Sequence, residues 1–199
     1  MKLIKITAAV LFSLAISISA QTNWKFDNSH TNVGFEVDHM VITTVEGEFT
    51  DYEGTVKTDG EGFENAKVNF TINAASISTD NEKRDNHLRS DDFFNAEKFP
   101  KLIFNSKSMK LVDGDWKLVG DLTIRDVTKE VELDVDYRGM VEDPWGNTRA
   151  GFEISGVINR FDYNLKWNNL LETGGLVVGE DVTLKIDVQL VKVKDSDEA

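Results

Sequence analysis

The chain has 199 residues, 40% of them hydrophobic, and carries 35 acidic residues against 22 lysines and arginines, a formal net charge of −13 at pH 7. An acidic surface repels nucleic acid, so the composition argues against a nucleic-acid-binding protein. The absence of cysteine excludes disulfides, thiolate metal sites and lipid attachment to a cysteine, so a hydrophobic core must stabilise the fold.

Residues 1–20 have the pattern of a secretory signal peptide. Lys2 and Lys5 precede a mostly apolar run from Ile6 to Ile18, and Ser19 and Ala20 are small residues suited to cleavage. The apolar run is shorter than the roughly 20 residues that a transmembrane helix needs. We expect cleavage near Ala20, a periplasmic or secreted mature protein, and a single domain over residues 21–199.

The first half of the mature chain alternates apolar with polar residues, a pattern that places successive side chains on opposite faces of a β-strand. Strands are expected at 32–37, 45–49, 52–58 and 68–74, with a turn at Asp59-Gly60-Glu61-Gly62. The alternation stops between residues 78 and 98. There, Thr79 or Asp80 is a candidate N-cap for a short helix that precedes Phe93 and Phe94.

The second half contains the longest alternating segments. Strands are expected at 102–106 and 118–124 around the Asp113-Gly114 turn, then at 130–141, 152–158 and 181–193. In the segment 130–141 the residues expected to face inward are Val131, Leu133, Val135, Tyr137 and Val141. A second break, 160–175, is rich in aromatic and aliphatic residues and is expected to cover one end of the fold.

These one-sided strands predict an all-β protein of about eight to ten antiparallel strands. Long strands with a single apolar face are typical of a sheet that closes into a barrel, with one or two short helices at its ends. The interior of such a barrel is filled either by its own side chains or by a ligand. The pattern alone leaves both possibilities open.

Several short strings, taken together, resemble the YceI family. They follow one another along nearly the whole mature chain: Asp27-Asn28-Ser29-His30, Gly47-Glu48-Phe49, Arg84-Asp85-Asn86-His87-Leu88, Phe99-Pro100-Lys101-Leu102, Leu122-Thr123-Ile124-Arg125-Asp126, Asn159-Arg160-Phe161-Asp162 and Val178-Gly179-Glu180-Asp181. The resemblance implies an extended, lipocalin-like antiparallel β-barrel exported to the periplasm, with an apolar tunnel for a polyisoprenoid chain or an isoprenoid quinone. The chain departs from the family pattern at Thr31 and at Tyr163-Asn164.

Candidate catalytic and metal-binding residues are few. The three histidines, His30, His39 and His87, lack metal-site spacing, and the acidic segment 80–92 lacks the glycine of a calcium loop. The carboxylates of Glu132, Asp134 and Asp136 alternate with apolar residues and are expected on the outer wall, in water, unlike those of a glycosidase. We therefore predict no metal, no catalytic residue and no covalent catalysis.

The prediction for function is a carrier that sequesters an isoprenoid lipid or quinone and needs no other cofactor. Transient membrane contact and a monomer or homodimer are compatible with it. Two alternatives stay open: an enzyme that acts on an isoprenoid ligand through His87 or Asp85, and an envelope stress-response interaction protein whose interior is filled. Thirteen residues are expected to line the ligand site: Phe35, Val37, Phe70, Ile72, Phe93, Phe94, Phe104, Leu122, Ile124, Leu133, Phe152, Phe161 and Trp167.

Overall fold

A computed structural model gives the structure of the protein and describes residues 21–60, 62–169 and 176–194. The predicted leader lies outside the described residues, as does part of the second break. The strands are β1 (Gln21–Phe26), β2 (Asn32–His39), β3 (Thr43–Phe49), β4 (Tyr52–Asp59), β5 (Lys67–Asn73), β6 (Ile77–Ser78), β7 (Lys101–Val112), β8 (Asp115–Ile124), β9 (Val127–Glu142), β10 (Thr148–Asn159) and β11 (Val178–Lys192). The one α-helix among the described residues is α1 (Glu82–Arg89), and two 3₁₀ turns span Ala74–Ser76 and Arg160–Tyr163.

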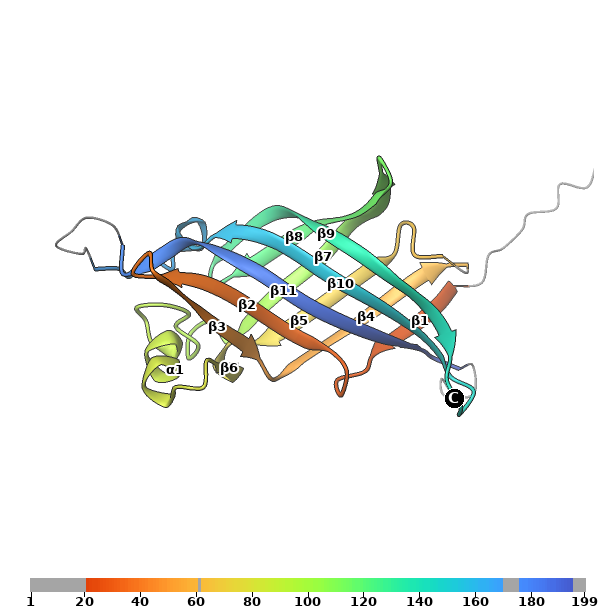
Figure 1. Cartoon of the computed structure of the whole chain (residues 1–199), viewed down its shortest axis with the longest axis horizontal. Coiled ribbons are helices and arrows are strands. Elements are labelled where there is room, and N and C mark those ends of the chain that lie inside the picture. Colours follow the sequence, from red (N-terminus) through yellow and green to blue (C-terminus); the bar gives the residue numbers. More distant parts are fainter. Residues whose placement is uncertain (1–20, 61, 170–175, 195–199) are drawn as a thin grey trace, which may run out of the picture.

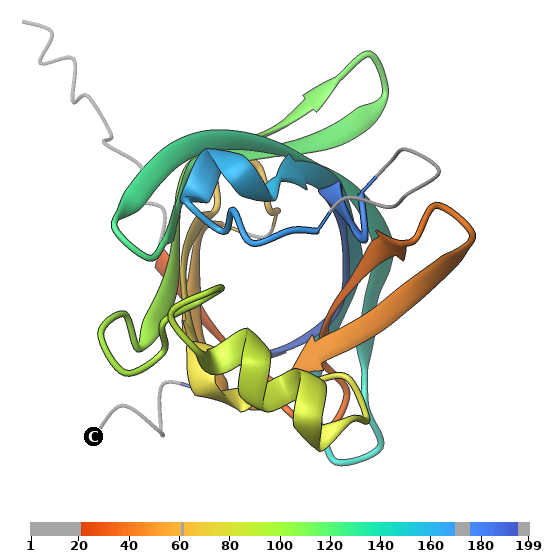
Figure 2. The same cartoon turned by 90° about the vertical axis from the view of Figure 1, so that its left-hand side faces the viewer.

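The strands form one antiparallel sheet that closes into the predicted barrel (Figures 1 and 2). The closed ring follows the order β1, β4, β5, β7, β8, β9, β10, β11, and the pairing of Trp24 with Lys192 joins its last strand to its first. Beyond the end of β1, β11 pairs instead with β2, and β3 and β6 extend the sheet from there. The strands β1 and β6 were not predicted, because β1 lacks clear alternation and β6 has only two residues.

The helix α1 lies at one end of the barrel, the left-hand end in Figure 1. Its N-cap is Asn81, whose side chain accepts a hydrogen bond from the amide of Arg84, so the expected caps Thr79 and Asp80 are wrong by one or two residues. The Asp85 carboxylate is buried and accepts hydrogen bonds from the amide and hydroxyl of Thr79 (2.9 and 2.5 Å). These bonds attach the helix to the chain that follows β6.

A β-bulge in β9 changes which residues face inward. The pairing with β10 shifts between Gly151 and Phe152, so that Phe152 lies opposite Tyr137 and Gly151 opposite Gly139, whose φ is +113°. One extra residue in a strand reverses the alternation beyond it. The prediction that Val141 faces inward is therefore wrong: its side chain is exposed.

The interior of the barrel contains two clusters of buried side chains. One cluster lies in the half of the barrel away from α1, and we call its four aromatic residues, Trp24, Phe63, Tyr137 and Phe152, the plug. Their ring centroids are 4.8 to 5.8 Å apart, a separation typical of favourable aromatic packing. The second cluster includes Phe49, Phe93, Tyr163 and Leu165 and packs beneath α1 and the segment after β10.

A network of charged side chains joins the connection between β1 and β2 to the β9–β10 turn. Arg149 donates one hydrogen bond to Asp27 and one, of 2.6 Å, to Asp143. Asp143 also accepts hydrogen bonds from the amides of Trp145 and Asn147. Burial alone raises the pKa of the Asp143 carboxyl, but these hydrogen bonds outweigh burial and hold its pKa well below the usual range.

We predict that Asp143→Asn lowers stability at pH 7 and weakens the dependence of stability on acid. Since the pKa of Asp143 is depressed in the folded state, its contribution is complete above the unfolded pKa of about 4 and is lost as the pH falls through the lower folded value. Urea unfolding at a series of pH values from 7 down to 2 measures this. A variant with the same acid dependence as the wild type would contradict the assignment.

Candidate functional site

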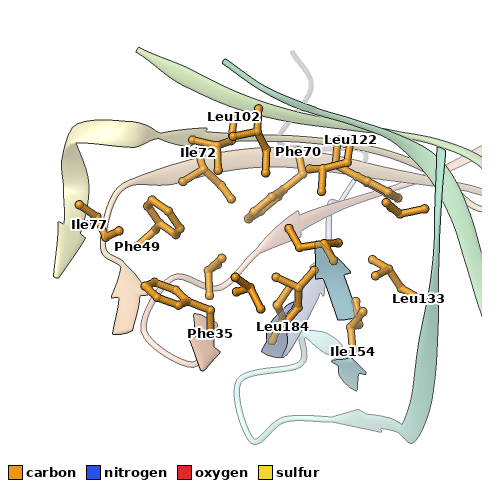
Figure 3. A pocket seen from close by; sticks show the side chains of 18 of the residues that line it. Phe35, Phe49, Phe70, Ile72, Ile77, Leu102, Leu122, Leu133, Ile154 and Leu184 are labelled. Carbon is orange, nitrogen blue, oxygen red and sulfur yellow. The ribbon is translucent and has the colours of Figure 1, made fainter. Parts of the chain in front are cut away.

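An apolar cavity of about 190 Å³ occupies the part of the barrel between the plug and α1 (Figure 3). Since roughly 10–15 Å³ is enough to hold one water molecule, this is far larger than a packing defect. The inward side chains of Phe70, Leu122, Ile154 and Leu184 are only partly buried, although they point into the barrel. Their exposure is to the cavity, so the interior is hollow here.

Every strand of the closed ring except β4 contributes to the lining, and so does β2. Ten of the thirteen residues predicted to line a ligand site do line this cavity: Phe35, Val37, Phe70, Ile72, Phe93, Phe94, Phe104, Leu122, Ile124 and Leu133. The prediction left out several lining residues whose inward direction the alternation indicates, among them Ile154, Val182, Leu184 and Ile186. The lining that the structure describes is apolar apart from Arg160.

The cavity is closed at the plug, and this corrects the position expected for Phe152. Its ring is buried; it packs edge-on against the Phe63 ring at 4.8 Å and in a tilted arrangement against the Tyr137 ring at 5.2 Å. Phe63 comes from the connection between β4 and β5, which folds into the barrel. Phe152 is therefore part of the plug and does not line the cavity.

At the other end, α1 and the residues after it cover the cavity. Leu88, Phe93 and Phe94 face the cavity from this segment. Trp167 does not line the cavity, contrary to the expectation; its ring lies behind Phe93 at 5.4 Å and against the ring of His87 at 4.9 Å. Trp167 thus supports a lining residue from outside.

Phe161 is the third residue that was expected to line the ligand site and does not line the cavity. Its ring lies beneath the guanidinium of Arg160, with 4.5 Å from the guanidinium carbon to the ring centroid, and it does not face the cavity. Phe161 belongs to the 3₁₀ turn Arg160–Tyr163, whose C-cap is Asn164; the φ of 63° there is left-handed, a conformation that asparagine tolerates better than most residues. The neighbouring Tyr163 is fully buried, and burial raises the pKa of its hydroxyl to about 12.

Arg160 is the one charged side chain among the described residues of the lining. It is 4% exposed, and its guanidinium donates to the carbonyl oxygens of Leu165, Trp167, Val178 and Gly179 at 2.5 to 3.0 Å. Burial lowers the pKa of this guanidinium, and the charge of Glu180 opposes that effect. The side chain fastens the segment after β10 to the start of β11 and so fixes this end of the cavity.

Arg160→Met is expected to destabilise the protein by at least about 2 kcal/mol, because buried carbonyl groups would lose their hydrogen-bond donors. Urea unfolding measures the loss. The matched control is Arg138→Met, since Arg138 is exposed on the outer wall and pairs there with Asp136 and Glu153. Equal stability of the two variants would show that the Arg160 contacts contribute little.

The residues considered for catalysis lie outside the cavity. The side chains of Glu132, Asp134 and Asp136 are about 60% exposed on the outer wall, where Lys117 and Arg138 pair with them. His87 is part of α1, and its Nε2 lies 2.9 Å from a carboxylate oxygen of Asp92 at the surface. Within the described ranges, no group of three potential metal ligands is present, and no helix is long and apolar enough to cross a membrane.

Comparisons with known proteins agree with this architecture. A family model for the YceI-like domain matches residues 24–190. The UPF0312 protein SA2479 of Staphylococcus aureus is 38% identical over 169 residues, which cover 84% of this chain and 96% of that protein. The crystal structure of the Campylobacter jejuni YCEI protein superposes with a TM-score of 0.68 at 34% identity, covering 84% of this chain and 96% of that one.

A polyisoprenoid binding domain from Saccharophagus degradans shares the fold at much lower sequence similarity. Its TM-score is 0.65 at 14% identity, and the superposition covers 85% of this chain and 98% of that domain. The predicted extended β-barrel is thus found both in proteins similar in sequence and in a distant one.

Proposed function

This chain belongs to the YceI-like family, and we propose that it binds the chain of an isoprenoid lipid in its cavity and carries that lipid outside the cytoplasm. The single observation that supports the proposal most strongly is the apolar cavity, closed by the plug at one end. The hydrophobic effect stabilises each buried methylene-sized group by about 0.8 kcal/mol, so a long chain needs no polar contact to bind.

The fold and the sequence support the choice of ligand and of compartment. The fold is shared with a domain described as polyisoprenoid binding. Residues 1–20 have the pattern of a leader for export, which is consistent with a periplasmic or secreted carrier. Polyprenols and isoprenoid quinones share an apolar isoprenoid chain, which matches the apolar lining of the cavity in character, and they differ in a head group on which our proposal does not depend.

We favour binding and transport over catalysis. The Asp85 carboxylate is buried and already accepts two hydrogen bonds from Thr79, and the His87 ring packs edge-on against Phe93 and Trp167. These contacts give both residues a role in holding the end of the barrel. The alternative of a filled interior does not fit a cavity of about 190 Å³.

Extraction of the purified protein with organic solvent, followed by mass spectrometry, tests the proposal. We expect an isoprenoid lipid in the extract, and after its removal we expect the protein to take up a dispersed polyprenol or an isoprenoid quinone at one molecule per chain. Supplying both compounds in separate titrations distinguishes the two ligand classes. Repeated lipid-free preparations that take up neither compound would overturn the proposal.

A further inference from the structure

The turn between β2 and β3 exposes three consecutive apolar side chains. Met40, Val41 and Ile42 are 40%, 73% and 81% exposed. Two backbone hydrogen bonds hold the turn in place. The Met40 amide donates to the Val177 carbonyl at 2.9 Å, and the Ile42 amide donates to the His39 carbonyl at 3.2 Å. An ordered turn therefore presents these side chains to the surroundings.

The sequence of this turn is unfavourable for its backbone. Met40 and Val41 have φ values of 53° and 65°, the signs of a type I′ turn, in which asparagine and glycine are preferred. The β7–β8 turn of the same protein has the same signs, at 53° and 100°, and uses Asp113 and Gly114. A left-handed conformation is strained for valine, so the turn combines backbone strain with exposure of apolar groups. Backbone strain lowers stability and exposed apolar groups lower solubility, which indicates that the turn has a role other than stabilising the fold.

The turn lies beside the end of the cavity that α1 covers. His39, the residue before it, pairs with Val178, and both Val178 and Val37 line the cavity. Figure 1 shows the turn and α1 at the same end of the barrel, and Figure 2, which faces that end, shows the β2–β3 hairpin projecting outward from the ring. The plug and the β9–β10 turn lie toward the opposite end.

We propose that the turn Met40-Val41-Ile42 inserts into the apolar layer of a lipid bilayer and positions the adjacent end of the cavity for exchange of an isoprenoid chain. This rests on the proposed function and adds to it the surface through which the lipid is loaded. Three side chains are far too few for a stable protein interface, which buries about 800 Å² on each partner, but they suffice for weak, reversible insertion.

The charges around the turn specify the kind of membrane. Residues 32–49 include Glu36, Asp38, Glu46 and Glu48 and no lysine or arginine; Lys185 of β11 pairs with Glu36, and the other three carboxylates give the hairpin a negative charge. Acidic groups are repelled by an anionic lipid surface, so the turn fits a bilayer of mostly zwitterionic lipid. Binding should then weaken as anionic lipid is added, the reverse of the behaviour of basic membrane-binding segments.

The test is a triple variant, Met40→Asn, Val41→Gly and Ile42→Thr, which keeps the turn and removes its apolar side chains. With vesicles of phosphatidylcholine that contain a polyprenol, we expect co-flotation and the rate of polyprenol uptake to fall by roughly tenfold. Since the strain is relieved, Tm should rise by about 2–4 °C. The matched control is Trp145→Ala, since Trp145 is 78% exposed in the β9–β10 turn at the far end and its loss should change neither vesicle measurement.

Uptake of the same polyprenol dispersed without vesicles separates this inference from the proposed function. We expect the triple variant and the wild type to take up dispersed polyprenol equally. If neither takes it up, the proposed function fails, and this inference fails with it. If dispersed uptake is normal but the triple variant loads from vesicles as fast as the wild type, or if Trp145→Ala is the slow variant, the inference alone is overturned. Loading that requires a membrane protein in the vesicles would point to a protein partner and would also overturn it.

Discussion

Leu184→Trp is expected to abolish the uptake of a dispersed polyprenol while the barrel stays folded. Leu184 faces the cavity from β11, is only partly buried, and lies opposite Gly156 in the pairing with β10 (Figure 3). An indole ring at this position would occupy the space that the lipid chain needs. Because Leu184 borders a cavity of about 190 Å³, the larger side chain has room to extend and should not cause the overpacking that destabilises a filled core.

The matched control for this variant is Val157→Trp. Val157 lies on the neighbouring strand β10, is exposed on the outer wall, and pairs with Thr183, so the same residue type is introduced close by but outside the barrel. We expect normal uptake, measured by intrinsic fluorescence during titration with polyprenol, and both variants should keep the circular dichroism of the wild type. Normal uptake by Leu184→Trp would contradict the assignment of the cavity as the binding site.

Phe152→Ala is expected to lower the free energy of unfolding by about 3–5 kcal/mol, the usual cost of removing a buried phenylalanine ring. Phe152 is buried in the plug, where its ring contacts Phe63 and Tyr137, and its loss would leave a void among rings that other parts of the chain hold in place. Urea unfolding followed by tryptophan fluorescence measures this change.

Phe35→Ala serves as the comparison, because the Phe35 ring borders the cavity and is only partly buried. Its removal enlarges an existing space and loses fewer contacts, so the loss of stability should be clearly smaller than for Phe152→Ala. Equal losses in the two variants would mean that the barrel is packed to the same degree at both positions, contrary to the division into plug and cavity.

The strands other than β1 and β6 were predictable from the sequence, because their apolar and polar residues alternate and give each of them one apolar face. In β11, the residues Val182, Leu184, Ile186, Val188 and Leu190 face inward, as their alternation with polar residues predicts. The alternation predicts the wrong inward residues beyond the bulge of β9, because the inserted residue changes the facing of the strand there. The apolar residues themselves do not show where the residue is inserted. Gly139 is the one local signal, because glycine within a strand often marks a bulge.

The division of the interior into plug and cavity was not predictable from the strands. Phe152 and Ile154 are two residues apart on the same face of β10, yet the first is in the plug and the second faces the cavity. The difference comes from Phe63, which enters the barrel from the connection between β4 and β5, and from Trp24 of β1. Alternation reports the face of a strand and carries no information on what fills the space opposite it.

The structural role of Arg160 is a second feature that the spacing of residues in the sequence does not predict. The residue belongs to one of the strings that resemble the YceI family, and a charged residue within an apolar segment is a signal that it is buried with partners. Its four acceptors come from residues 165–179, which have no regular pattern. Only the folded chain shows which carbonyl groups it reaches.

Native mass spectrometry of the wild-type protein mixed with a polyprenol is the most direct test of a hollow barrel that holds an isoprenoid chain. We predict a species with one bound polyprenol per chain, present in the wild type and in Val157→Trp and absent in Leu184→Trp. A wild-type protein that stays free of lipid at every polyprenol concentration, or that binds lipid equally well with tryptophan at position 184, would contradict our account.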